Sequence, residues 1–147
     1  MLNLSMNFDI NSISTTQTIS KPWGQEIIYT TPDLKYTFKQ IQIRDGARLS
    51  LQSHTEKVET FVLIEGQADL LIGPDSDHLQ TIHMEIKTGY TIPIGTVHRM
   101  VGIKDAIILE ASTPETGTTH RYQDDYQRPD ETENLRQQQN RGWQPNQ

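Results

Sequence analysis

The stretch that decides the fold of this chain is GARLSLQSHTEKVETFVLIEG, residues 46–66. It reads as an alternating strand, a polar corner and an apolar strand that ends at a glycine. On an extended segment alternate residues share a face, so four polar side chains of the first strand are expected to point the same way: Arg48, Ser50, Gln52 and His54. On the returning strand, Glu59 shares its face with Phe61 and Leu63, which indicates that its carboxylate points into the interior.

A second stretch, GYTIPIGTVHRM at residues 89–100, carries a histidine directly after a tight turn, in the pattern P-x-G-x-x-H. Burying an unpaired carboxylate is costly, and a bound cation removes that cost. We therefore expect one metal site with four ligands: Gln52, His54, Glu59 and His98. Imidazole, carboxylate and amide donors suit Zn²⁺, Mn²⁺, Fe²⁺, Co²⁺ or Ni²⁺ rather than a soft ion. A single histidine in a β-protein is more often a hydrogen-bonded core or surface residue, so the prediction depends on the joint spacing.

Short β-prone runs separated by turn residues surround these two stretches, from residue 26 to residue 111. Their spacing favours an all-β fold, an antiparallel sandwich or barrel. The sequence predicts a flexible N-terminal arm over residues 1–20 and a barrel with a C-terminal arm over residues 21–128. Residues 129–147 are polar and rich in Gln and Asn, which predicts a disordered tail.

Composition excludes several classes of function. The net charge is −6 and the sequence pI is about 5.3, so there is no basic footprint for nucleic acid. The chain has no cysteine, which excludes a disulfide framework and a thiolate metal site. No segment approaches the run of apolar residues that a membrane span needs, and the first residues lack the pattern of a signal peptide. The expected location is cytoplasmic, with no membrane partner.

The combined pattern G-x5-Q-x-H-x4-E-x6-G followed by P-x-G-x-x-H resembles the cupin family, whose members are double-stranded β-helix, or jelly-roll, barrels. Gln52 stands where that family has its first histidine. A Gln-His-Glu-His ligand set is similar to that of phosphomannose isomerases.

The resemblance extends to one subgroup, the cupin domain of type II phosphomannose isomerases, over roughly residues 20–128. It is carried by the segments KPWG, GARLSLQSH, IPIGTVHR and RYQDDYQR, at residues 21–24, 46–54, 92–99 and 121–128. Two features depart from the subgroup. Thr55 and Glu56 stand where it has flanking histidines, and Gln127 stands where it has glycine.

This resemblance implies a metal-dependent isomerase that interconverts mannose 6-phosphate and fructose 6-phosphate through an enediolate, with Zn²⁺ as the first choice of metal. Lys39 is the first candidate for the base, because its parity with inward apolar residues predicts burial and a lowered pKa; an inward lysine paired with a glutamate is the alternative. Glu110 is a weaker candidate. Arg121 and Arg99 are candidates for the phosphate, with surface salt bridges as the alternative. Two further residues complete the expected substrate site: Arg48 and Trp23, although packing over the mouth or end of the core is the favoured explanation of Trp23.

Other functions remain open at this point. A cupin of this kind can bind a sugar or sugar phosphate without catalysis, act as a metal-dependent dioxygenase, or hold no metal. Gln52 argues against the dioxygenase, which normally keeps three histidines. The family also implies a homodimer formed by exchange of an edge strand, for which residues 1–20 are a candidate.

Overall fold

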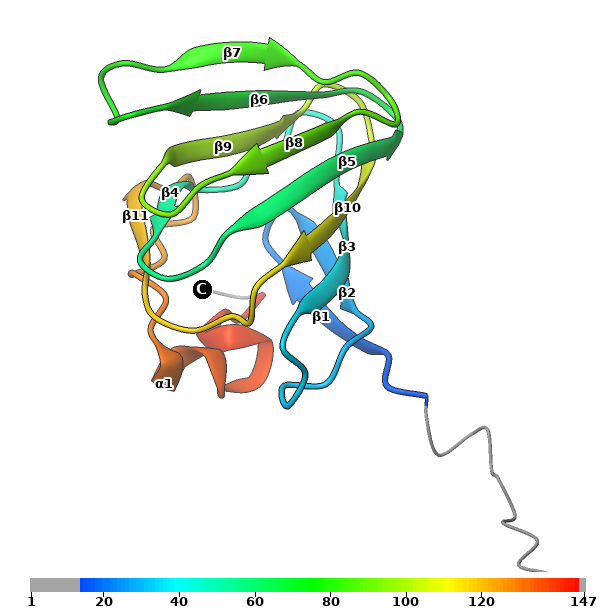
Figure 1. Ribbon diagram of the computed structural model, residues 1–147, viewed down its shortest axis with the longest axis vertical. Helices are drawn as coiled ribbons and strands as arrows, with labels where there is room; N and C mark the ends of the chain where they lie inside the picture. The colour runs from blue at the N-terminus through cyan, green and yellow to red at the C-terminus, as the bar shows by residue number, and fades with distance from the viewer. Residues whose placement is uncertain (1–13, 146–147) are drawn as a thin grey trace, which may run out of the picture.

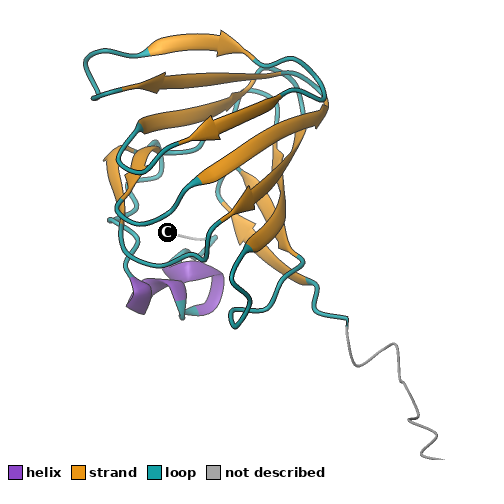
Figure 2. Ribbon diagram, in the orientation of Figure 1, coloured by secondary structure: helices purple, strands orange, loops and turns teal. Residues whose placement is uncertain are grey.

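The computed structural model describes residues 14–145. In this part of the chain, eleven strands form two antiparallel sheets that face each other as a flattened barrel (Figures 1 and 2). One sheet has the order β1 (Gln17–Lys21), β2 (Gly24–Ile28), β3 (Thr37–Ile43), β10 (Ala106–Ser112), β5 (Glu59–Glu65) and β8 (Gly89–Ile92). The other has the order β11 (Thr119–Gln123), β4 (Leu51–His54), β9 (Val97–Gly102), β6 (Ala68–Gly73) and β7 (Gln80–His83). The predicted all-β barrel is confirmed.

The core lies between the sheets and is filled by the inward residues of each strand. Buried and partly exposed positions alternate along β3, β5 and β10, as the two-residue period of a strand requires. One end of this interior is apolar, with Ile41, Phe61 and Ile108 almost fully buried. Toward the opposite end the same inward rows continue as Lys39, Glu59 and Glu110. The strand period therefore places charged groups inside the barrel mouth.

Strand β4 begins later than the sequence pattern indicates. It covers Leu51–His54, and residue 48 makes only an isolated bridge to Val101. The shared face predicted for four polar residues holds for Ser50, Gln52 and His54, which line one cavity. Arg48 instead forms an exposed ion pair with Asp125, because regular alternation does not extend back to it.

Two strands lie in segments where the sequence predicts none. Strand β1 pairs with β2 within the predicted N-terminal arm, so in its described part the arm is irregular only up to residue 16; residues 1–13 lie outside the described residues. Strand β11 pairs with β4. Both are edge strands with many exposed polar residues, and such strands lack the apolar alternation that marks a central strand.

The structure corrects the predicted disordered tail for residues 129–145. They contain the helix α1 (Glu133–Arg136) and the 3-10 turn η2 (Gln139–Gly142), which lie below the open end of the barrel (Figure 1). Glu131 is buried, and its carboxylate accepts hydrogen bonds from Arg136 and Arg141. The prediction considered apolar burial alone, whereas this segment is held by charge pairing. Residues 146 and 147 lie outside the described part.

Gly66 fixes the turn after β5, and its replacement by alanine is expected to cost about 3 kcal/mol or more of unfolding free energy. Its φ is +83°, and an added Cβ would lie 1.8 Å from the backbone oxygen of Asp105. Gly46 is the matched control: its φ is +74°, but no atom lies within 4 Å of an added Cβ. Gly46→Ala should therefore cost only the left-handed backbone term of about 1–2 kcal/mol. Urea unfolding of both variants measures the difference, and equal losses would contradict it.

Candidate metal centre

Three buried side chains from neighbouring segments converge at the barrel mouth. His54 ends β4, Glu59 begins β5 and His98 lies on β9; one ligand atom from each lies within 4.8 Å of the others. The Oε1 atom of Glu59 is 3.0 Å from Nε2 of His54 and 2.8 Å from Nε2 of His98. Three of the four residues predicted from spacing therefore meet around one point.

The contacts of His98 fit a bound cation. Its Nδ1–H donates to the backbone oxygen of Thr96 at 3.0 Å, which in the neutral ring leaves a lone pair on Nε2. That buried Nε2 faces the Glu59 carboxylate and makes no hydrogen bond within the described chain. Two acceptors at this distance repel unless a cation lies between them. An oriented imidazole whose free nitrogen faces a carboxylate is the arrangement that a metal ligand needs.

Burial and local charge keep the other two ligands in the forms that bind metal. Burial, followed by the positive charge of Lys57, lowers the pKa of His54 to about 4, so this histidine is neutral at neutral pH. Its Nδ1 is paired with the Thr119 hydroxyl at 3.0 Å. Burial opposes ionisation of Glu59, but the positive charge of Lys57 and the hydrogen bond from His54 outweigh it and hold the pKa of Glu59 well below its usual range.

Gln52 lies beside this group. It is directly opposite His98 in the β4–β9 pairing and lines the same cavity as His54 and Glu59. The Ser50 hydroxyl donates to its Oε1 at 2.7 Å, which fixes the amide and leaves a second lone pair on the oxygen. Its role as the fourth ligand stays a prediction.

A buried network of ion pairs continues from the candidate metal ligands into the barrel. Lys57 contacts Glu59 at 2.6 Å and Glu110 at 3.1 Å, and Lys39 contacts Glu110 at 3.5 Å and Glu115 at 2.6 Å. Burial raises the pKa of Glu110 to about 7, against the opposing effect of both lysines. This carboxyl group can therefore exchange a proton near neutral pH.

The structure does not support the lowered pKa that makes Lys39 a candidate base. Burial acts to lower its pKa, as expected, but the carboxylates of Glu110, Glu115 and Glu26 outweigh burial and raise the pKa of Lys39 well above its usual value. Lys39 is thus a fixed cation, paired with glutamates as in the alternative reading. The sequence revealed its burial but not the three carboxylates that surround it.

The remaining predicted site residues divide into two groups. Trp23 and Arg121 line the cavity that contains His54 and Glu59. Arg99 is buried elsewhere, where it donates to the backbone oxygens of Leu49 and Gln123. Neither Arg99 nor the exposed Arg48 lines this cavity. Arg99 is held by backbone oxygens, and Arg48 is held by its ion pair with Asp125.

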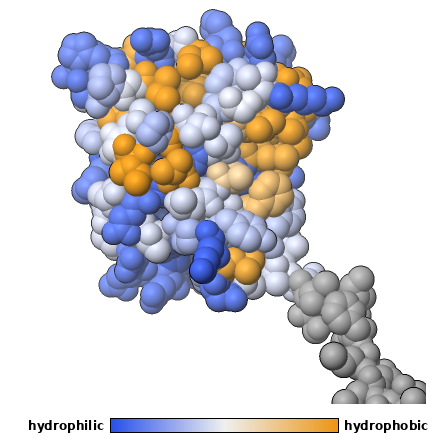
Figure 3. Space-filling model, in the orientation of Figure 1, coloured by the Kyte–Doolittle hydropathy of each residue, from blue (hydrophilic) through white to orange (hydrophobic). Residues whose placement is uncertain are grey.

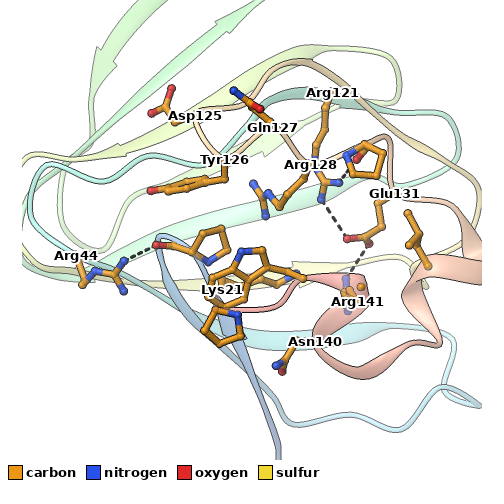
Figure 4. A pocket seen from close by; sticks show the side chains of 16 residues that line it. Lys21, Arg44, Arg121, Asp125, Tyr126, Gln127, Arg128, Glu131, Asn140 and Arg141 are labelled. Carbon is orange, nitrogen blue, oxygen red and sulfur yellow. Dashed lines mark hydrogen bonds and ion pairs between the residues drawn. The ribbon is translucent and has the colours of Figure 1, made fainter. Parts of the chain in front are cut away.

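Two adjacent hollows lie at the barrel mouth. The inner cavity, beside the metal centre, has a volume of about 50 Å³, and the outer pocket has a volume of about 750 Å³. They share five lining residues: Lys21, Arg121, Arg128, Glu131 and Arg141. Figure 4 shows the outer pocket, with the C-terminal turn on one side and the segment after β11 on the other. Residues 129–145 thus cover the inner cavity.

Several residues of this mouth were missed by sequence reasoning. Arg141 pairs with the carboxylates of Glu115 and Glu131, and Lys57 lies between Glu59 and Glu110. Lys57 could have been identified from the sequence, since it is a cationic residue at a position where the resembled subgroup has arginine. Arg141 and Glu131 carried no such signal, because the polar composition of the C-terminal segment does not predict the order that brings them to the mouth.

The departures from the subgroup pattern have local explanations. The Thr55 hydroxyl accepts a hydrogen bond from the backbone of Thr118, and Glu56 is exposed. Neither residue lines the inner cavity. Gln127 has a φ of +54°, a conformation that glycine adopts at lower cost, which accounts for the glycine in related sequences.

Comparison with known proteins identifies relatives in polysaccharide synthesis. The chain is 33% identical over 99 residues to an alginate biosynthesis protein of Pseudomonas aeruginosa, covering 64% of this chain and 19% of that protein. It is 33% identical over 84 residues to a xanthan biosynthesis protein of Xanthomonas campestris, with coverages of 56% and 16%. A mannose-1-phosphate guanylyltransferase of Sinorhizobium fredii is 30% identical over 100 residues, with coverages of 68% and 18%. The chain spans about a fifth of the length of these relatives.

Solved structures with the same architecture share little sequence with this chain. The capsular polysaccharide assembling protein CapF of Staphylococcus aureus matches with a TM-score of 0.61 and 16% identity, over 87% of this chain and 33% of that one. A variant of the Bacillus subtilis oxalate decarboxylase matches with a TM-score of 0.62 and 15% identity, over 72% and 30%. These matches show the fold alone, which is the cupin barrel.

A family model provides the assignment. The model described as "Mannose-6-phosphate isomerase C-terminal" matches residues 9–129, which is most of the chain and includes all four candidate ligands. In the part of the chain that the structure describes, neither helix has the length and apolarity to cross a membrane. The chain belongs to the family of mannose-6-phosphate isomerase C-terminal domains.

Proposed function

We propose that this protein is a metal-dependent aldose–ketose isomerase that interconverts mannose 6-phosphate and fructose 6-phosphate. The observation that carries the proposal is the position of Glu110. Burial raises the pKa of this carboxyl group to about 7, and it lines the same cavity as the candidate metal ligands His54 and Glu59. A proton carrier and a cation site in one enclosed space are the two parts that this reaction needs.

In this proposal His54, Glu59 and His98, with Gln52, hold a divalent ion, and Zn²⁺ is the first choice for such nitrogen and oxygen donors. The ion, when bound, supplies Lewis acidity and orients the sugar oxygens. Glu110 removes the proton from C2 of the aldose and returns it to C1, while the proton of the C2 hydroxyl passes to the C1 oxygen, so that an enediolate lies between substrate and product.

Two fixed lysines support this chemistry. Lys39 and Lys57 both contact the Glu110 carboxyl group, at 3.5 and 3.1 Å, and hold it in place. Their positive charges lie in a site shielded from water, where they favour the negative charge that develops on the enediolate. In this proposal Lys39 is a positioning residue rather than the base. Trp23 and Arg121 line the cavity and contact the substrate.

A coupled assay tests the proposal by measuring fructose 6-phosphate formed from mannose 6-phosphate, with and without added Zn²⁺. We expect turnover that is lost in chelator and recovered with metal. Binding of mannose 6-phosphate without turnover, in metal-loaded protein, would exclude the isomerase.

A second candidate function is a non-catalytic binding module for a sugar or sugar phosphate. It is favoured by the inner cavity, whose volume of about 50 Å³ has room for only a few water molecules. A hexose phosphate reaches the metal ligands only if residues 129–145 move aside. If they do not, a ligand is confined to the outer pocket and no isomerisation takes place.

We also propose that the protein forms a homodimer through the outer face of the six-stranded sheet rather than by exchange of an edge strand, because β1 pairs with β2 of its own chain. Half-buried Val62 and Leu109 are paired on this face, with Ile64 and Phe38 exposed nearby. Figure 3 shows apolar surface over the region of β5 and β10. Light scattering after gel filtration should give twice the chain mass of 16.9 kDa, and Leu109→Lys should give one chain mass with unchanged circular dichroism. A wild-type mass of one chain would contradict this.

The cytoplasmic location stays a prediction.

A further inference from the structure

The outer pocket is a basic hollow at the barrel mouth. Its lining includes five cationic side chains: Lys21, Arg44, Arg121, Arg128 and Arg141. Two carboxylates are also present, Asp125 and Glu131. Tyr126, labelled in Figure 4, supplies an apolar wall, and Trp143 also lines the pocket. A hollow of about 750 Å³ with this charge is suited to an anionic ligand.

The arginines of this pocket already have partners. Arg128 makes a two-pronged pair with Asp124, at 2.9 and 2.7 Å. Arg121 donates to the Pro129 backbone oxygen and to Glu131. Arg141 pairs with Glu131 at 3.1 Å and with a second carboxylate. Arg44 donates to the backbone oxygen of Pro22.

Lys21 differs from these arginines. Its side chain is 4% exposed, and among the described residues its nearest carboxylate contact is Glu26, at 3.9 Å, which is beyond hydrogen-bond distance. Burial lowers the pKa of Lys21 to about 8, because Glu26 only partly offsets it. The Lys21 ammonium group has three donors, is paired at a distance with one carboxylate, and lines the outer pocket, where an anionic ligand can reach it. Lys21 lines both the inner cavity and the outer pocket, so it lies where the two meet. We call this region, lined by the five shared residues, the neck.

The charge balance around the neck points the same way. The ion pairs that connect the metal centre to the C-terminal segment join six cations: Lys21, Lys39, Lys57, Arg121, Arg136 and Arg141. They join five carboxylates: Glu26, Glu59, Glu110, Glu115 and Glu131. A divalent ion at the metal centre adds further positive charge, which an anionic ligand would balance.

We propose that Lys21 binds the phosphate group of the ligand at the neck between the outer pocket and the inner cavity. The proposal deepens the proposed function by placing the anionic end of its substrate, and it replaces Arg99 as a phosphate contact. A phosphate monoester bound there directs the rest of the molecule toward the candidate metal ligands. The pair with Glu26 is then what remains when no anion is bound.

Isothermal titration of the full chain, stripped of metal by chelator, with inorganic phosphate tests this assignment. Lys21→Met keeps the length of the side chain and is expected to weaken phosphate binding about 10-fold or more, as the loss of a charged hydrogen bond does. Lys21→Arg should bind within a few-fold of wild type. Lys104→Met, which removes an exposed lysine, is the matched control and should leave binding unchanged.

A pH series adds a readout that a structural role would not change. Lys21 is faced by Glu26 of β2, Lys39 of β3, and Glu131 and Arg141 of the C-terminal segment. Sulfate, which keeps its charge over this range, should bind wild type more weakly as the pH rises through about 8. Lys21→Arg should not show this loss, because arginine stays protonated.

Equal phosphate affinity of wild type and folded Lys21→Met would overturn the proposal, as would wild type that binds neither anion at millimolar concentration. If Lys21→Met does not fold, sulfate binding by wild type with no decline above pH 8 would overturn it. The titration is done without metal and does not depend on isomerase activity. Phosphate binding by a protein that shows no isomerase activity would therefore contradict only the proposed reaction.

Discussion

Replacing Glu110 with glutamine is expected to lower kcat for mannose 6-phosphate by about 100- to 10,000-fold, the range that general acid–base catalysis contributes. The substitution keeps the shape of the side chain and its place between Lys39 and Lys57. It removes the only function that depends on titration, the transfer of a proton. Metal content should therefore stay at the wild-type level, which elemental analysis of the same preparation measures.

The pH profile separates a proton carrier from a structural carboxylate. A base must be deprotonated, so wild-type kcat/KM should rise with pH up to the pKa of Glu110, about 7, and then level off. A divalent ion nearby lowers this pKa, so the rise ends at or below pH 7 in the metal-loaded protein. Glu26→Gln is the control for loss of a buried charge in the same network. Because Glu26 is the carboxylate beside Lys21, its loss acts on KM, and kcat should fall far less than in Glu110→Gln. Equal losses in both variants would contradict the role of Glu110.

Replacing Glu59 with glutamine is expected to weaken divalent metal binding by more than about 100-fold, since even residues outside the ligand shell cost 10- to 100-fold. Glu59 is the ligand that both histidines face. The substituted amide can donate to Nε2 of His98, which removes the repulsion between acceptors that the metal relieves in wild type. The variant should therefore stay folded although it does not bind the metal.

Thermal unfolding with and without Zn²⁺ measures this change. At a metal concentration of 100 times Kd, binding stabilises the wild type by about 2.7 kcal/mol, so its Tm should rise by several degrees. The Tm of Glu59→Gln should not respond to Zn²⁺ or to chelator, whereas that of Glu26→Gln should respond as wild type does. A metal-dependent Tm in Glu59→Gln would show that the ion binds elsewhere.

The candidate ligands could be predicted from sequence because each lies at a fixed offset from a turn. His54 and Glu59 flank one corner and His98 follows another, so strand parity and the glycines of the pattern place them. The protonation behaviour of Lys39 and Glu110 could not be predicted in this way. It depends on carboxylates and lysines that are far apart in sequence and meet only in the folded barrel.

The same limit applies to the C-terminal segment. Its composition indicates disorder, because few apolar residues are present to bury. Order comes instead from Arg141 and Glu131, whose partners lie on β2, on β11 and in the loop before it. Edge strands β1 and β11 were missed for a related reason, since they are selected by pairing with a neighbour rather than by their own pattern.

The most direct test of the metal centre is anomalous diffraction at the zinc edge from crystals grown with Zn²⁺ and mannose 6-phosphate. The strongest peak should lie between His54, Glu59 and His98, within bonding distance of the Gln52 amide oxygen. Three exposed histidine–carboxylate pairs serve as internal controls for adventitious binding: His78 with Asp75, His83 with Asp69, and His120 with Asp130. Zinc at these exposed pairs, with none between His54, Glu59 and His98, would contradict a metal centre in the barrel mouth.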